Sequence, residues 1–206
     1  MRPAVFIDKD GTLVDDVPYN VDPAKVTFGM DAFEGLRMLH RQGYLLVVVT
    51  NQPGIAMGLF DYAALSALER FLVDALQAEG IPLTGFMACP HDPAVEACFC
   101  RKPRPGLLHQ AAAQFDIDLV RSWMVGDILN DIEAGHRAGC RTVFMDVGNE
   151  TEWVRSPLRT PVHSARTLLE AAQVIVAAEA GTLPAPYLPR DSSPGTFLGD
   201  VPRAAA

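Results

Sequence analysis

The sequence predicts an α/β protein in three layers, with a parallel sheet covered by helices on both faces. Residues 44–49 form a continuous run of aromatic, aliphatic and β-branched side chains, which is typical of a strand buried on both sides. Short apolar segments of this kind alternate along the chain with segments of helical periodicity. This alternation indicates parallel strands joined by right-handed helical crossovers.

The first half of the chain is expected to contain three strands and two helices. Phe33, Leu36 and Leu39 recur at helical spacing, and Gly43 is expected to end their helix. Asp61 is suited to cap a long helix with one apolar face, which Gly80 closes. In chain order we expect a strand at 4–7, a loop at 15–22, the helix before Gly43, a strand at 44–49, a polar turn at 50–54, the helix from 61 to 80 and a weaker strand at 84–88.

The second half begins with a loop rich in Cys, His and Pro at residues 89–105. After it we expect a helix at 107–115, a strand at 123–125, a helix at 131–138, strands at 141–145 and 161–164, and a helix from 165 to about 178. We expect residues 1–180 to form a single domain. Residues 181–206, rich in Pro, Ala and Ser with little periodicity, are expected to form an extended or disordered tail.

Composition narrows the class of protein. The 206 residues are enough for one good-sized core. The net charge of -8, without a block of Lys or Arg, argues against a nucleic-acid partner, although a local cation could still bind a phosphorylated molecule. No apolar run is long enough to cross a membrane and no signal peptide is visible, so we expect a cytoplasmic protein without a membrane partner.

Polar side chains follow the predicted strands where each strand ends. Asp8 and Asp10 follow the first strand, Thr50 and Asn51 the second, and Asp127 the strand at 123–125. The carboxyl ends of parallel strands form one edge, at which open α/β sheets bind their ligands. An acidic turn that closes a strand would explain Asp8 and Asp10 alone. Coincident polar signals at several strand ends indicate instead a site for a divalent cation and a phosphate.

Four motifs in this order resemble those of the haloacid dehalogenase (HAD) superfamily of phosphohydrolases. They are Asp8-Lys9-Asp10-Gly11-Thr12, Thr50-Asn51-Gln52, Arg101-Lys102-Pro103 and Gly126-Asp127 with Asp131. The resemblance extends over residues 4–146. It implies a Rossmann-like (HAD-like) fold and a Mg²⁺-dependent phosphatase.

The resemblance also implies a role for each acidic residue. Asp8 would be the nucleophile that forms an aspartyl-phosphate, and Asp10 the general acid and base. Asp8, the backbone carbonyl of Asp10 and Asp127 would hold Mg²⁺. Asp131 is expected to orient Lys102 or a metal-bound water rather than bind Mg²⁺ directly.

The remaining motif residues are expected to bind phosphate and substrate. Thr50 and Lys102 would bind the phosphoryl oxygens and stabilise their charge in the transition state. The other residues that we expect to contact substrate are Asn51, Gln52, Arg101, Asp16 and Tyr19.

A zinc loop is predicted at residues 89–102. Cys89 and His91, followed by Cys98 and Cys100, supply three sulfurs and an imidazole. In a reducing compartment such a cluster indicates a metal site more than a disulfide framework. Four protein ligands suit a closed tetrahedral Zn²⁺ site that stabilises structure and leaves no position for a catalytic water. Unrelated buried cysteines are the alternative. The motif resembles the zinc loop of the HAD branch that contains heptose-1,7-bisphosphate 7-phosphatases and histidinol-phosphate phosphatases.

The substrate is expected to be small, because no segment is long enough for a large cap domain. Such an open architecture is compatible with a monomer. The stretch Thr-Asn-Gln-x-Gly-Ile-Ala-x-Gly from residue 50 resembles the heptose-bisphosphate phosphatases, so a sugar bisphosphate is expected. Met57 departs from that pattern, because those enzymes usually carry an arginine there. The six residues between His91 and Cys98 are closer to the histidinol-phosphate type. Histidinol phosphate is therefore the alternative substrate, and a catalytically silent, zinc-stabilised binding protein is the alternative of another class.

Overall fold

The computed structural model describes residues 1–95 and 97–182. Apart from Gly181 and Thr182, the predicted tail at 181–206 lies outside the described residues. The elements from residue 4 to residue 179 contribute to a single sheet and its helices. The division of the chain at residue 180 stays a prediction.

The described residues form a six-stranded sheet in the order β3-β2-β1-β4-β5-β6, and each neighbouring pair is parallel. The order reverses direction at β1, so the chain winds first to one side of this strand and then to the other. The strands are β1 Ala4–Ile7, β2 Leu45–Asn51, β3 Gly85–Cys89, β4 Trp123–Gly126, β5 Arg141–Met145 and β6 His163–Ala165. The predicted fold class is confirmed.

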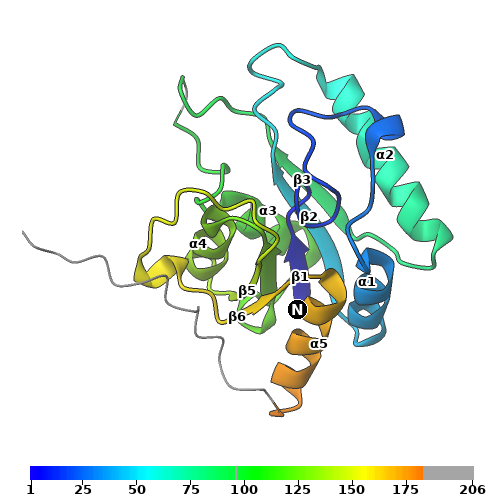
Figure 1. Ribbon diagram of the computed structural model, residues 1–206, viewed down its shortest axis with the longest axis vertical. Helices are drawn as coiled ribbons and strands as arrows, with labels where there is room; N and C mark the ends of the chain where they lie inside the picture. Colours follow the sequence, from blue (N-terminus) through cyan, green and yellow to red (C-terminus); the bar gives the residue numbers. More distant parts are fainter. Residues whose placement is uncertain (96, 183–206) are drawn as a thin grey trace, which may run out of the picture.

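Helices cover both faces of this sheet (Figure 1). They are α1 Ala32–Arg41, α2 Tyr62–Ala78, α3 Gly106–Phe115, α4 Leu129–Arg137 and α5 Leu168–Glu179, with short 3-10 turns η1 Pro23–Lys25, η2 Leu119–Arg121 and η3 Pro157–Arg159. The predicted cap of α2 is confirmed, because the Asp61 carboxylate accepts a hydrogen bond of 2.8 Å from the backbone N–H of Ala64.

Two apolar cores lie on opposite faces of the sheet, and β1 contributes to both because its side chains alternate. Val5 and Ile7 pack in the core covered by α1, α2 and α5. Ala4 and Phe6 face α3 and α4. All four side chains are fully buried. The helices α1 and α5 approach closely at Gly35, where a Cβ atom would lie 2.4 Å from the carbonyl oxygen of Leu168. This site therefore excludes any larger side chain.

Several predicted boundaries were wrong, and α4 and β6, for example, begin at Leu129 and His163 rather than at 131 and 161. Thr50 and Asn51 were expected in a turn, but they continue β2 because they pair with Ala88 and Cys89 of β3. Ala165 was expected in the last helix, but it ends β6 in register with Met145. That helix begins only at Leu168, since the Thr167 hydroxyl accepts a hydrogen bond of 3.2 Å from the N–H of Glu170.

No large cap covers the carboxyl edge of the sheet in the described part of the chain. Between β1 and α1 the chain forms only η1, and between β3 and α3 it forms the Cys/His loop. None of the helices in residues 1–95 and 97–182 is both long enough and apolar enough to cross a membrane.

Candidate active site

The polar strand ends meet in a cavity of about 360 Å³ at the carboxyl edge of β1, β2 and β4. The cavity brings together every residue predicted for catalysis or substrate contact. Its wall comprises Asp8, Asp10, Asp16, Pro18, Tyr19, Thr50, Asn51, Gln52, Pro53, Arg101, Lys102, Asp127, Ile128, Asn130 and Asn149. Met57 is not among these lining residues, so its departure from the expected pattern does not change the described wall.

Three carboxylates form the negative part of the site. One oxygen from each of Asp8, Asp127 and Asp131 lies within 4.8 Å of the other two, and all three residues are buried. Burial, with the neighbouring Asp8 and Asp131 carboxylates, raises the pKa of Asp127 to about 8. Such a group of hard oxygen ligands with mutual repulsion fits a divalent cation such as Mg²⁺. The side chain of Asp10 lies outside this trio, and the contribution of its backbone carbonyl stays a prediction.

Lys102 is the buried cation opposite these carboxylates. Its Nζ lies 2.5 Å from an Asp8 oxygen, 2.7 Å from an Asp131 oxygen and 2.9 Å from the carbonyl oxygen of Val49. Burial opposes its charge, but Asp131 and Asp8 raise the pKa of Lys102 above the ordinary value. Two of the three ammonium protons are donated in hydrogen bonds, to Asp8 and to the Val49 carbonyl, and the Asp131 contact is an ion pair. The geometry agrees with the prediction that Asp131 orients Lys102, and it makes Lys102 an organiser of the nucleophile.

Asp10 is held from both sides. Lys9, itself buried, pairs with one Asp10 oxygen, and Gln52 donates a hydrogen bond of 3.0 Å to the other. Burial raises the pKa of Asp10, although Lys9 opposes this shift. Gln52 also donates to the Thr50 hydroxyl at 2.9 Å, which leaves the Thr50 O–H free to donate into the cavity. Gln52 was expected to contact substrate, and its buried position makes it a link between Asp10 and Thr50.

Asn51 ties the Arg101-Lys102 segment to the end of β2. Its amide accepts a hydrogen bond of 3.0 Å from the Lys102 N–H and donates one of 3.2 Å to the Lys102 carbonyl. Arg101 is one of the residues that line the cavity, and its Nη1 is buried without a hydrogen-bond partner among the described residues. A buried N–H group without a partner is costly, so this nitrogen is suited to a ligand anion.

Sequence reasoning missed Asn149 and Thr12. The Asn149 amide donates a hydrogen bond of 2.7 Å to Oδ2 of Asp127, and the Thr12 hydroxyl donates one of 3.3 Å to Oδ1. Thr12 lies inside a quoted motif, so a role could have been assigned to it. Asn149 lies in the loop after β5 within no pattern, and only the parallel pairing of β5 with β4 brings it to Asp127. Glu150, which the sequence left without a specific role, accepts a hydrogen bond from the first residue of α4.

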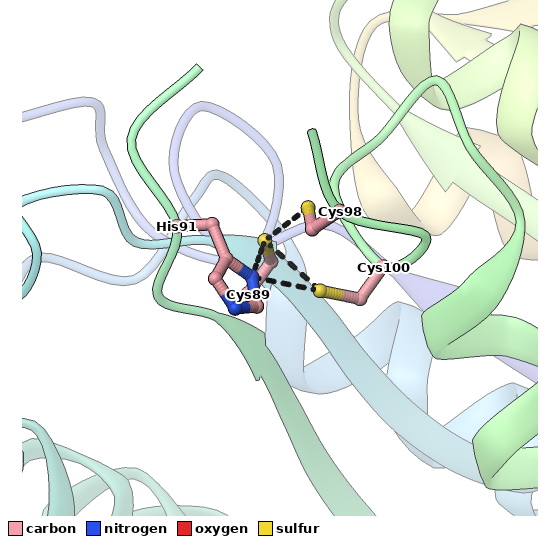
Figure 2. A group of neighbouring side chains, drawn as sticks. All are labelled: Cys89, His91, Cys98 and Cys100. Atoms are coloured by element: carbon pink, nitrogen blue, oxygen red, sulfur yellow. Dashed lines mark hydrogen bonds between the residues drawn. The ribbon is translucent and has the colours of Figure 1, made fainter. Parts of the chain in front are cut away.

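The four predicted zinc ligands converge at the end of β3 (Figure 2). The Cys89 sulfur lies 3.7 Å from the Cys98 sulfur and 3.2 Å from the Cys100 sulfur, and His91 Nδ1 lies 3.2 Å from the Cys100 sulfur. Sulfurs bound tetrahedrally at about 2.3 Å from a zinc ion lie roughly 3.8 Å apart. The spacing and the three sulfurs with one imidazole therefore fit Zn²⁺. None of these cysteines forms a disulfide.

A backbone contact joins this cluster to the cavity. The N–H of Arg101 donates to the Cys98 sulfur at 3.4 Å, and the next residue is Lys102. Burial opposes the ionisation of Cys98, but the Arg101 N–H and the neighbouring thiols lower its pKa to about 7. The thiolate is the form that binds zinc.

An acidic pair at the end of β1, a buried lysine and a carboxylate after β4, on this sheet order, define the class of HAD-type hydrolases. A family model described as HAD-hydrolase-like matches residues 99–171. The D-glycero-beta-D-manno-heptose-1,7-bisphosphate 7-phosphatase of Pasteurella multocida is 39% identical over 154 residues, covering 72% of this chain and 84% of that protein. The phosphatase of the same name from Salmonella typhi is 36% identical over 171 residues, covering 76% and 91%. The chain belongs to the HAD superfamily of phosphatases, in the branch that contains these enzymes.

A solved structure supports the same conclusion. The D,D-heptose 1,7-bisphosphate phosphatase from B. bronchiseptica, complexed with magnesium and phosphate, matches with a TM-score of 0.71 and 28% identity, covering 86% of this chain and 99% of that chain. The corresponding phosphatase from Burkholderia thailandensis matches with a TM-score of 0.56 and 25% identity, covering 85% and 99%. The predicted resemblance is therefore confirmed.

Proposed function

We propose that this phosphatase hydrolyses the 7-phosphate of D-glycero-D-manno-heptose 1,7-bisphosphate through an aspartyl-phosphate. The observation that carries the chemistry is the meeting of Asp8, Lys102 and Asp127 in one open cavity. The assignment of the substrate rests on 36–39% sequence identity to enzymes named for that reaction.

In the first step, an Asp8 oxygen forms a bond to phosphorus while the bond from phosphorus to the sugar oxygen breaks. Asp10 donates its proton to that oxygen, and the raised pKa of Asp10 supports this role. In the second step, Asp10 takes a proton from water. The water oxygen bonds to phosphorus, the Asp8 carboxylate leaves and inorganic phosphate is released. Lys102 orients the Asp8 carboxylate for attack through its 2.5 Å contact.

Mg²⁺ would be held by Asp8, Asp127 and the backbone carbonyl of Asp10. When bound, it would neutralise the clustered charge and polarise the phosphoryl group. The Thr50 hydroxyl donates to a phosphoryl oxygen. Asp131 fixes Lys102 from the far side of the cluster, where it is completely buried.

The second phosphate distinguishes a bisphosphate from a simple phosphate ester. The unpartnered Nη1 of Arg101 is the group on the cavity wall best suited to receive it. The backbone N–H of Arg101 is bound to the Cys98 sulfur, and the backbone N–H of the next residue is bound to Asn51. The backbone that carries the Arg101 guanidinium is therefore held in place. Asp16 and Tyr19 also line the cavity, and we propose that they contact the hydroxyl groups of the sugar. We propose that Asn51 and Gln52 act by positioning Lys102, Asp10 and Thr50.

The Cys89, His91, Cys98 and Cys100 cluster is proposed as a structural Zn²⁺ site. Its ligands come from both ends of the loop that precedes Arg101, so zinc binding fixes the position of that arginine. For the whole molecule we propose a cytoplasmic monomer that binds a small phosphorylated metabolite and has no nucleic-acid or membrane partner. Its net charge of -8 is consistent with this proposal.

A panel of phosphate esters tests the proposal. The panel contains the heptose 1,7-bisphosphate, heptose 7-phosphate, histidinol phosphate and an aryl phosphate, each with Mg²⁺, and release of inorganic phosphate is measured. The highest kcat/KM is expected for the bisphosphate. In an Arg101→Ala variant the bisphosphate should lose about 10-fold or more in kcat/KM while the aryl phosphate changes little, because only the bisphosphate has a charged group to lose.

Two outcomes would replace the proposal. A preference for histidinol phosphate would agree with the six residues between His91 and Cys98 and would make that ester the substrate. Absence of phosphate release from every ester, with zinc bound and the fold intact, would favour the zinc-stabilised binding protein.

A further inference from the structure

We propose that Asn149 is a positioning residue for Asp127, and that Glu150 holds it in place. The inference rests on the proposed function, because it concerns the carboxylate that would bind Mg²⁺. It assigns a role in the site to the loop after β5, which none of the four sequence motifs includes.

Two donors fix the Asp127 carboxylate, one on each oxygen. Asn149 Nδ2 lies 2.7 Å from Oδ2, and Thr12 Oγ1 lies 3.3 Å from Oδ1. The Asn149 contact is the shorter and Asp127 is only 3% exposed, so the direction of the carboxylate depends chiefly on this amide. Each oxygen retains a further lone pair that can bind a cation.

Gly11 makes room for this pair. A Cβ atom at Gly11 would lie 2.1 Å from Oδ2 of Asp127 and 2.3 Å from Nδ2 of Asn149. The φ angle of Gly11 is +79°, which other residues rarely adopt. The turn after the nucleophile therefore leaves space for both members of the Asp127–Asn149 hydrogen bond.

Glu150 ties the Asn149 loop to the helix that follows Asp127. Its Oε2 accepts a hydrogen bond of 2.7 Å from the N–H of Leu129, the first residue of α4. Its Oε1 accepts bonds of 2.8 Å and 3.2 Å from the N–H groups of Glu152 and Trp153. One carboxylate thus closes the loop and binds it to the N-terminus of α4, where a negative charge is favourable.

This arrangement is suited to a neutral orienting group. An amide donor holds a carboxylate without neutralising it, whereas a lysine in the same place would compete with the cation. Partners of metal-binding carboxylates typically change metal affinity by about 10–100-fold when they are removed. We therefore expect Asn149 to set the cation affinity of the site.

The experiment measures Mn²⁺ binding without substrate, from the electron paramagnetic resonance signal of free Mn²⁺. Asn149→Ala should raise the Mn²⁺ dissociation constant by about 10-fold. Its melting temperature and zinc content should stay within error of the wild type. At saturating Mg²⁺ most of kcat should return, with KM for the phosphate ester unchanged, which a general loss of structure would not produce. The matched control is Gln77→Ala, which removes an exposed amide from α2.

The outcomes separate the two proposals. An Asn149→Ala dissociation constant within two-fold of the wild type overturns the role of Asn149 alone. If Asn149→Ala does not fold, Glu150→Gln provides the test, because it weakens the anchor of the loop without altering the Asn149 side chain itself. Weaker Mn²⁺ binding is then required, and unchanged binding overturns the inference. A wild-type protein that binds no Mn²⁺, like an Asp127→Ala control, would overturn the proposed function itself.

Discussion

Two metal-suited clusters lie close together in this protein, and they are built in opposite ways. The zinc cluster takes its four ligands from one loop of twelve positions, Cys89 to Cys100. The carboxylate cluster takes Asp8 from the residue after β1 and Asp131 from α4, which lie 123 positions apart in the sequence. The first can form from local chain alone, whereas the second exists only after β1 and β4 have paired.

The clusters also differ in how they balance charge. Thiols and an imidazole can be neutral in the absence of a zinc ion. In the carboxylate cluster, burial and neighbouring carboxylates raise the pKa of Asp127, and the ammonium group of Lys102 pairs with the other two, Asp8 and Asp131. The difference suggests that the zinc cluster fixes structure, while the carboxylate cluster keeps a charge imbalance for use in chemistry.

Removal of zinc should have the largest effect on stability. Cys100→Ser loses one of four ligands, and structural zinc contributes on the order of 10 kcal/mol to the segment that binds it. We expect loss of zinc by elemental analysis, a lower melting temperature and loss of activity through Arg101 and Lys102. Cys140→Ala is the matched control, since Cys140 is buried apart from the cluster. Full zinc content in Cys100→Ser would contradict the ligand assignment.

Asp8→Asn should have its largest effect on catalysis. Removal of a nucleophile typically lowers kcat by on the order of 10⁴-fold or more. Zinc content and fold should not change, because Asp8 lies outside the zinc cluster. The change is measured as release of phosphate from the aryl ester. Asp74→Asn, on the exposed side of α2, is the control and should retain wild-type kcat. Substantial turnover in Asp8→Asn would show that another residue attacks phosphorus.

The same contrast explains what the sequence could predict. The zinc ligands share one loop, so their spacing was sufficient to find them. Asp8, Lys102 and Asp127 carried motif signals because the chemistry fixes their residue types. The parallel sheet followed from the alternation of strands and helices, but the order of its strands came only from the structure.

The residues that escaped prediction act through contacts that only the fold creates. Asn149 contacts Asp127 from the loop after β5, and no sequence motif or residue spacing predicts this contact. Gln52 lines the cavity, and its amide also donates to Asp10 and Thr50, two contacts that the sequence did not show. The end of β2 was placed too early because Thr50 and Asn51 are polar, whereas their pairing with β3 decides the strand. The polarity of individual residues does not predict whether they pair with a neighbouring strand.

Lys102→Met tests the charge balance of the carboxylate cluster. Loss of one partner of a buried ion pair typically costs about 3–5 kcal/mol, because the remaining charge is left without compensation. We expect the free energy of unfolding to fall by this amount in metal-free buffer and to recover partly when Mg²⁺ is added. Urea unfolding with and without Mg²⁺ measures both effects. Equal destabilisation in the two buffers would mean that Mg²⁺ does not compensate the carboxylates.

A smaller, pH-dependent effect is expected where the loop after β5 is anchored to α4. Glu133 accepts hydrogen bonds from Arg159 of η3 at 2.7 Å and from Arg137 at 2.6 Å. Burial alone would raise the pKa of Glu133, but these two guanidinium groups lower it below its ordinary value. A carboxylate with a lowered pKa adds stability above its unfolded pKa of about 4.3 and loses it as pH falls through the folded value.

Glu133→Gln should therefore lower the free energy of unfolding by about 1 kcal/mol at pH 7 and by less near pH 4. Urea unfolding between pH 7 and pH 4 measures the difference, and Glu69→Gln, with no ion pair among the described residues, is the control. Zinc content should not respond to either change. A loss in Glu133→Gln that is independent of pH would mean that packing, rather than charge, joins η3 to α4.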